Sequence, residues 1–337
     1  MSRISFGMWA AMALILAPLT GAQSYTVTDL GVLPGAISSN AAAINDYGEV
    51  VGNSNDHAFL WTPSGGMQDL GTLAGDTESY GYAINDSGTV VGLSQSDIGK
   101  HAFLWTQTGG MQDLGNLGGE NWAAAEGINS SGAVVGFSHL ANNVTTHAFL
   151  WTQATGMQDI GTLSGAAQSG AQAINNTGAV VGISYPSQEP YTYRGFLWTA
   201  GKGMQAIGTL GKDQDSFALA ISASGRVVGY ASPLSITTET AFDWSQNQGI
   251  QSLRAGNQSV ASGINNLGEI VGGYDFEDAF TAFVWTPIGH LQNLNDLIPS
   301  DSGWFLDQAI AVNQSGQIVA NGEINGQFHA ALLTPTN

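Results

Sequence analysis

Short apolar runs alternate with glycine-rich polar segments along almost the whole chain. Residues 83–115 are typical and read AINDSGTVVG, a short loop, HAFLWT, four turn residues and MQDLG. Each apolar run is four to six residues long, rich in Val, Ile, Phe, Trp and Leu, and bounded by Gly, Asn, Asp or Ser. This pattern predicts short β-strands joined by tight turns. No stretch after the first 22 residues shows sustained helical periodicity, so the sequence predicts an all-β protein.

The same segment is repeated along the chain at intervals of 40 to 48 residues. The best copies read INxxGxVVG, followed by an FLW-like run and, in most repeats, by an MQDL-like run. The seven copies begin at Ile44, Ile84, Ile128, Ile174, Ile221, Ile264 and Val312. Four antiparallel strands at this interval are typical of one blade of a β-propeller. The predicted fold is therefore a seven-bladed β-propeller of four-stranded antiparallel blades.

The two ends of the chain complement each other. Residues 25–33 read as a fourth strand with no strands before it, and the last repeat stops after its third strand. A ring closed by the N-terminal strand leaves no open sheet edge. We therefore predict that this strand completes the last blade, and that residues 23–337 form a single propeller domain.

The first 22 residues differ in character from the repeats. Arg3 is followed by the apolar run Phe6 to Leu19 and by small residues up to Ala22. This order is that of a secretory signal peptide, and the apolar run is short for a membrane span. We predict cleavage near Ala22 and a secreted protein, extracellular or periplasmic, without a membrane span.

The repeat resembles a known family. The AINxxGxVVG, HAFLWT and GMQDLGTLGG-like elements are similar to those of the bacterial HAF-repeat family of extracellular repeat proteins, over nearly all of residues 25–334. The HAF triplet itself begins at His57, His101 and His147, whereas the fourth repeat departs from the triplet at Gly195. The resemblance implies secretion and a repeat fold, and it brings no activity or catalytic residue.

The composition narrows the range of partners. The chain has 26 acidic and 7 basic residues, a formal net charge of −19. Phosphate backbones would be repelled, which argues against a nucleic-acid partner. Cysteine is absent, so the chain can form neither disulfides nor thiolate metal sites. We expect a monomer without a cofactor.

The strand order sorts the loops onto two faces. Short, uniform turns join the first strand of each blade to the second and the third to the fourth, on what we call the turn face. The loops between second and third strands and the connections between blades lie on the opposite face, which we call the variable-loop face. Loops that vary on a uniform scaffold are where binding is expected.

Aromatic and charged residues are predicted at the variable-loop face and at the mouth of the central channel. Aromatic rings beside polar groups suit the binding of sugars. We therefore predict a binding scaffold for an extracellular glycan or polymer, or for a protein. The candidate ligand-binding residues are Tyr80, Tyr82, Trp122, Glu126, Tyr191, Tyr193, Arg194, Phe217 and Trp304.

Two alternatives belong to other classes. A carbohydrate-active hydrolase or lyase would need a pair of carboxylates near the channel mouth, acting as acid and base. The candidates for that pair are Glu120, Glu126, Asp215 and Asp307. The other alternative is a structural surface or matrix protein without a small ligand.

The sequence gives little support for a metal site. His57, His101, His147 and His329 occupy one equivalent position in different blades, too far apart to meet at one ion, so we predict a structural role at the start of the third strand. The repeated Asp69, Asp113 and Asp159 are interpreted as charges that protect an edge strand. Two acid-rich loops offer weak calcium candidates, and neither matches a known calcium motif. These candidates are Asp213, Asp215, Asp275, Glu277 and Asp278.

Overall fold

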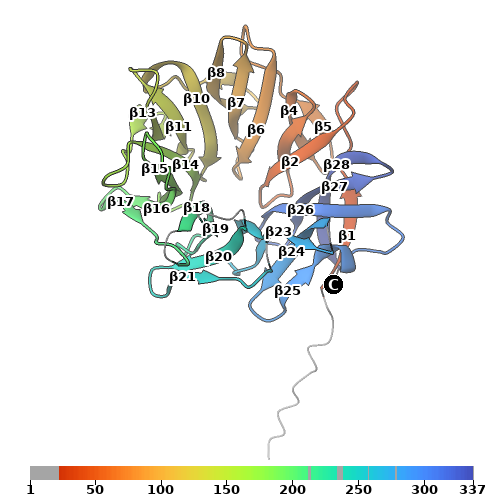
Figure 1. Cartoon of the computed structure of the whole chain (residues 1–337). Helices are drawn as coiled ribbons and strands as arrows, with labels where there is room; N and C mark the ends of the chain where they lie inside the picture. Colours follow the sequence, from red (N-terminus) through yellow and green to blue (C-terminus); the bar gives the residue numbers. More distant parts are fainter. Residues whose placement is uncertain (1–22, 212–213, 234–237, 257, 278, 337) are drawn as a thin grey trace, which may run out of the picture.

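The computed structural model describes residues 23–336 except 212–213, 234–237, 257 and 278. Within this part of the chain β-sheets surround a central axis (Figure 1), and the one helical element is the short 3-10 helix η1 (Leu294–Asp296). No described helix has the length and apolar character needed to cross a bilayer. The predicted signal peptide and its cleavage point lie outside the described residues.

Each repeat forms four consecutive strands, and the last repeat forms three. The first and second repeats contain β2 (Ser39–Ile44), β3 (Val50–Ser54), β4 (His57–Thr62), β5 (Gly66–Asp69), β6 (Glu78–Ile84), β7 (Val90–Ser96), β8 (Gly99–Thr106) and β9 (Gly110–Asp113). The third and fourth contain β10 (Gly118–Ile128), β11 (Val134–Leu140), β12 (Thr146–Thr152), β13 (Gly156–Asp159), β14 (Gln168–Ile174), β15 (Val180–Tyr185), β16 (Arg194–Thr199) and β17 (Gly203–Ala206).

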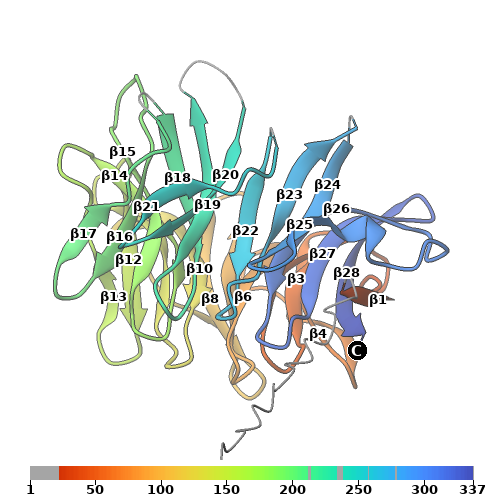
Figure 2. The ribbon, with the colours of Figure 1, turned by 90° about the horizontal axis from the view of Figure 1, so that it is seen from below.

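The remaining repeats follow the same order. The fifth and sixth contain β18 (Gln214–Ile221), β19 (Val227–Pro233), β20 (Thr240–Ser245), β21 (Gly249–Ser252), β22 (Val260–Ile264), β23 (Ile270–Phe276), β24 (Ala279–Thr286) and β25 (His290–Asn293). The seventh contains β26 (Trp304–Val312), β27 (Ile318–Ile324) and β28 (Gln327–Thr336), and β1 (Ser24–Asp29) precedes all of them. Figure 2 shows the loops beside β15 and beside β23 and β24 at the upper edge of the ring.

The strands form five four-stranded sheets and one eight-stranded sheet. The prediction of a propeller built of antiparallel four-stranded units is confirmed, but the prediction of seven separate blades is correct only in part. The second and third repeats share the eight-stranded sheet because one parallel pair, Trp122 with Lys100, joins β10 to β8. β10 is 11 residues long, and it pairs with β8 at Trp122, within the register shift between Gly118 and Ala123 where it leaves its antiparallel ladder with β11.

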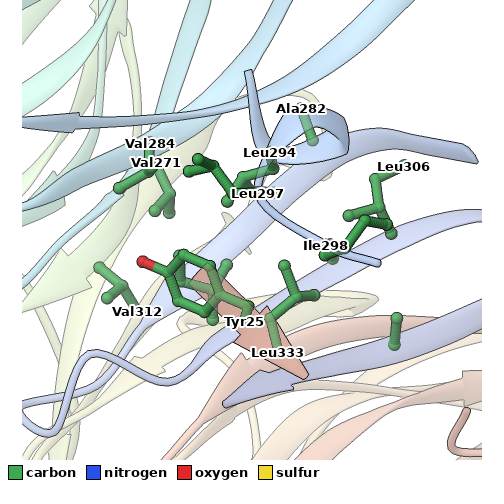
Figure 3. Close-up of a cluster of buried hydrophobic side chains, with 14 residues drawn as sticks. Tyr25, Val271, Ala282, Val284, Leu294, Leu297, Ile298, Leu306, Val312 and Leu333 are labelled. Atoms are coloured by element: carbon green, nitrogen blue, oxygen red, sulfur yellow. The ribbon is translucent and has the colours of Figure 1, made fainter. Parts of the chain in front are cut away.

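The first strand of the chain lies at the edge of the last sheet, as the sequence predicts. β1 pairs antiparallel with β28 from Ser24 opposite Thr336 to Asp29 opposite Ala331. Tyr25 is 2% exposed and packs in a cluster with Leu333, Val312 and Leu294 of η1 (Figure 3). Burial of its ring raises the pKa of the Tyr25 hydroxyl. The N-terminal strand is therefore part of the core.

Hydrophobic clusters fill the space between neighbouring sheets. One of them combines Val50 and Phe59 of the first repeat with Val319 and Leu332 of the last. The innermost strands also contact their neighbours in sequence around the axis, from β2 through to β26, and β26 contacts β2. The largest buried side chains are the phenylalanines of the third strands, Phe59, Phe103, Phe149, Phe196, Phe242 and Phe283.

The last glycine of the VVG motif is required by a close approach of two strands. A Cβ at Gly92 would lie 1.9 Å from the carbonyl oxygen of Tyr80. The two strands are this close because the first strand contains a register shift, between Gly81 and Ala83 in this repeat. A bulge of this kind leaves one residue unpaired and redirects its side chain. In the second and third repeats the residues at the bulge are Tyr82 and Glu126.

The asparagine of the INxxG motif joins neighbouring repeats on the turn face. Asn85 is typical: its Oδ1 accepts from the backbone N–H groups of Ser87 and Thr89, and its Nδ2 donates to the carbonyl of Asn129 in the next repeat, at 3.1 Å. The fifth repeat has Ser222 at this position, whose hydroxyl accepts from the Arg226 N–H. We call the equivalent residues the asparagine ring: Asn45, Asn85, Asn129, Asn175, Ser222, Asn265 and Asn313.

Candidate functional site

Five aromatic rings gather on the variable-loop face over the fourth and fifth repeats. Tyr193 lies at the centre, with its ring centroid 4.9 Å from that of Tyr185, 5.2 Å from Phe217 and 6.4 Å from Tyr191. Phe217 stacks on Tyr230 at 4.5 Å, and these two residues are directly opposite on β18 and β19. We call these five residues the aromatic cluster. Tyr191 is 42% exposed and the other four are half-buried, so the cluster presents ring surface to solvent.

A buried carboxylate fixes the loop that carries two of these rings. Asp215 is 9% exposed, and its Oδ1 accepts from the Tyr193 N–H at 2.9 Å. Arg194 Nη1 lies 3.4 Å from the same oxygen and also donates to the carbonyls of Tyr193 and Gln214. Burial raises the pKa of Asp215, and the Tyr193 N–H and the Arg194 charge oppose this. Asp215 and Arg194 therefore position the cluster, and the arginine charge is already paired.

A second group surrounds the junction of the two fused sheets. Glu78 accepts from Tyr80 Oη at 3.0 Å and from Gln95 Nε2, and these bonds, the Gln95 bond first, lower the pKa of Glu78. Trp122 is 37% exposed, stacks on His139 at 5.1 Å and lies under Lys100 Nζ, 4.5 Å from the ring centroid. Two side chains thus already cover the Trp122 ring, which reduces the surface it can offer to a ligand.

Glu126 and Tyr82 come from the bulges of adjacent innermost strands. Burial raises the pKa of the Glu126 carboxyl to about 7. Burial first and then the charge of Glu126 raise the pKa of the Tyr82 hydroxyl. The sequence predicted both residues at the channel mouth. The raised pKa means that Glu126 exchanges a proton near neutral pH, as a general acid or base must.

The raised pKa of Glu126 leads to a testable prediction about the stability of the folded protein. Ionised Glu126 destabilises the folded state, so stability should fall as the pH rises from the unfolded pKa of about 4.3 to the folded value of about 7. We expect Glu126→Gln to be more stable than the parent by about 3 kcal/mol near pH 8 and equal to it near pH 4. Urea unfolding at both pH values measures this. Glu120→Gln, at an exposed position of the same strand, is the matched control and should change little.

The four predicted catalytic carboxylates lie in three different sheets. Glu120 and Glu126 belong to β10, Asp215 to β18 and Asp307 to β26. The acidic neighbour of Asp307 is Glu323, which the sequence analysis missed: burial and then the Glu323 charge raise the pKa of Asp307. β26 and β27 bring the two together, since Leu306 is opposite Gly322. Cross-strand register could have identified Glu323, but the irregular β26 obscured it.

The structure describes Trp304 and some of the calcium candidates. Trp304 is partly buried and packs against the cluster around Tyr25, so only part of its ring is free. Asp275 and Glu277 are exposed at the end of β23. Asp213 and Asp278 lie outside the described residues. Among the residues that the structure describes, no group of three or more His, Asp or Glu side chains is placed to hold a metal ion.

The repeated histidines have structural partners. His57 Nδ1 lies 2.8 Å from Asp69, and the equivalent pairs are His147 with Asp159 and His329 with Asp29. His101 instead pairs with Asp76 at 3.0 Å. The structural role predicted for the histidines is confirmed. Asp69 and Asp159, which we interpreted as charges that protect an edge strand, also have local partners: their carboxylates pair with the histidines and accept from the N–H of the glycine two residues on.

Solved structures with similar folds are β-propellers of low sequence identity. A streptogramin B lyase is 8% identical with a TM-score of 0.58, over 93% of this chain and 98% of the lyase. The extracellular domain of BT4673 from B. thetaiotaomicron is 9% identical with a TM-score of 0.53, over 91% of this chain and 39% of that chain. TolB from Acinetobacter baumannii is 12% identical with a TM-score of 0.49, and the chain covers 80% of its own length and 62% of that of TolB. The similarities to the streptogramin B lyase and to the extracellular domain of BT4673 show the fold alone.

Sequence comparison places the chain in a family. No curated protein matches it. A family model described as "Protein of unknown function (DUF3466)" matches residues 120–327, which is more than half of the 337 residues. The match begins in β10 and runs to the start of β28, across most of the repeats. The chain therefore belongs to the DUF3466 family.

Proposed function

We propose that this protein is a secreted binding scaffold that holds an extracellular glycan or other polymer on its variable-loop face. The observation that carries the proposal is the aromatic cluster, whose half-buried rings are supported by the Asp215–Arg194 pair. Rigid aromatic surfaces with a few fixed polar groups are typical of ligand sites, and rings held by strands or by a loop that is fixed by hydrogen bonds lose little freedom on binding.

The architecture suits a scaffold of this kind. We interpret the fused sheet as two blades, since a single residue pair joins them, and the whole as a seven-bladed ring closed by β1. Secretion is supported by the leader-like first 22 residues and by the resemblance to HAF-repeat proteins. In such a ring the loops on the variable-loop face can change without disturbing the core.

A carbohydrate-active hydrolase or lyase is the second candidate. The observation in its favour is Glu126, whose pKa of about 7 beside Tyr82 suits proton transfer at the channel mouth. An enzyme would release sugar ends from a polymer that it binds, whereas a scaffold would retain the polymer unchanged.

Binding to a panel of polysaccharides distinguishes these functions. Residues 23–337 would be incubated with immobilised plant and bacterial polysaccharides and scored for retention and for reducing-end release. We expect retention without release, weakened about tenfold by Tyr191→Ala or Phe217→Ala through loss of stacking surface. Tyr47→Ala removes a ring that is 71% exposed on the turn face and should bind like the parent. Release of sugar ends would favour the enzyme, and retention unaffected by either cluster variant would contradict the proposed site.

A further inference from the structure

The exposed apolar side chains are distributed unevenly between the two faces. Among the described residues eleven large hydrophobic side chains are exposed, and eight of them lie on the variable-loop face. The three on the turn face are Tyr47, Leu267 and Ile288. Isolated exposed hydrophobic residues need no explanation, but a repeated position on one face does.

Most of these side chains stand at the same structural position in successive repeats. Ile98, Val144, Tyr191, Phe276 and Phe328 lie at or beside the loop between the second and third strands of five repeats. In the first repeat the corresponding side chain is that of Ile37, which belongs to the connection before β2. Ile37 lies beside the loop between the second and third strands, because its N–H donates to Asn55 Oδ1 in that loop. In the fifth repeat residues 234–237 of this loop lie outside the described part. We call these six residues the apolar crown.

Cross-strand pairing widens the crown at the last repeat. Glu323 is opposite Phe305 on one side and Phe328 on the other, so the three side chains form one row across the sheet. Phe305 is 42% exposed and Phe328 is 44% exposed. Two aromatic rings therefore flank an exposed carboxylate, which gives an apolar surface with a negative centre.

Carboxylates accompany the crown in most repeats. The described parts of the loops between second and third strands contain no lysine or arginine. Of the nearby basic residues, Arg194 is paired with Asp215 and Lys100 lies over Trp122. The exposed acids at or next to these loops are Asp56, Asp97, Glu189, Asp275, Glu277 and Glu323.

We propose that the apolar crown docks a partner polypeptide whose surface combines positive charge with apolar side chains. Apolar contacts would supply affinity, and charge complementarity would select a cationic partner and steer its approach. A second copy of this chain, with its net charge of −19, would be repelled, as would an anionic lipid surface. This inference shares only Tyr191 with the proposed glycan site, and the crown variant used below leaves Tyr191 and the rest of the aromatic cluster unchanged.

Two triple variants test the proposal. The crown variant is Ile98→Ser, Val144→Ser and Phe276→Ser, and the matched control on the turn face is Tyr47→Ser, Leu267→Ser and Ile288→Ser. None of the six belongs to the buried core, so both variants should unfold at nearly the parent temperature. The probes are a fluorescent peptide of alternating Lys and Leu, a peptide of alternating Lys and Ser, and phosphatidylcholine vesicles, each titrated with residues 23–337.

We expect the Lys–Leu peptide to bind, with the dissociation constant raised about tenfold or more in the crown variant and less than about twofold in the control. The Lys–Ser peptide should bind at least about tenfold more weakly than the Lys–Leu peptide. Equal losses in the two triple variants would overturn the proposal, and so would equal binding of both peptides, which would indicate charge alone. Binding to the vesicles that the crown variant abolishes would replace the polypeptide with a lipid surface.

Discussion

A chain that begins at Gly31 is expected to lose most of its stability. The deletion removes β1 and with it the buried Tyr25, the partly buried Val27 and Leu30, which is 5% exposed. At about 2 kcal/mol for each of these side chains, their burial alone amounts to roughly 6 kcal/mol, comparable to the whole stability of many domains. β28 would also lose its ladder with β1 and become an exposed edge, a site for aggregation.

Thermal unfolding followed by circular dichroism, together with size-exclusion chromatography, measures this effect. We expect no cooperative transition or a much lower midpoint, and association of the shortened chain. A synthetic peptide of residues 23–33 should restore the transition by pairing with β28. Asp29→Asn is the matched control, because it breaks only the partly exposed pair with His329 and should cost less than about 1 kcal/mol. An unchanged midpoint for the chain that begins at Gly31 would show that the ring does not depend on β1.

Substitution of a residue in the asparagine ring is expected to have the second large effect on stability. Asn85 is 6% exposed and makes four hydrogen bonds, two with backbone N–H groups, one with the Ser87 hydroxyl and one with the carbonyl of Asn129. Asn85→Ala leaves buried backbone groups without partners, and we expect a loss of about 3 kcal/mol in the free energy of unfolding.

The fifth repeat supplies the converse experiment. Ser222 occupies this position of the asparagine ring, and its hydroxyl accepts from the Arg226 N–H. Asn175 donates to the carbonyl of Ser222, but the serine side chain is too short to donate in the same way to the carbonyl of the next repeat. Ser222→Asn should add a bond to the carbonyl of Asn265 and stabilise the protein by about 1 kcal/mol. Urea unfolding of both variants measures the two changes. If Asn85→Ala were neutral and Ser222→Asn gave no gain, the ring would have no part in holding the repeats together.

The fold could be predicted from the sequence because the same pattern of strands and turns occurs in every repeat. The strand order, the short turns and the place of β1 at the edge of the last sheet all follow from the pattern of apolar runs and the incomplete ends of the chain. The fusion of two sheets was not predicted, because it depends on one pair, Trp122 with Lys100, that departs from the repeat. The bond from Asn85 to Asn129 was missed because it joins residues 44 apart in different repeats.

The candidate site was predicted less completely than the fold. Tyr191 and Tyr193 were expected on the variable-loop face and Phe217 at the mouth of the central channel, and the structure brings the three rings together. Tyr185 and Tyr230 were missed because their contacts depend on the path of a long loop and on register with β18. The pairing of His57 with Asp69 could have been found, since the same spacing of 12 residues recurs at His147 and Asp159.

The central claim is that ligands bind to the variable-loop face. Hydrogen–deuterium exchange of residues 23–337, with and without a retained polysaccharide, tests it most directly. We predict slower exchange in residues 185–194 and 214–230, which carry the aromatic cluster, and no change in residues 44–49 and 84–89 of the turn face. Protection confined to the turn face, or retention of a polymer with no protection around the aromatic cluster, would contradict the claim.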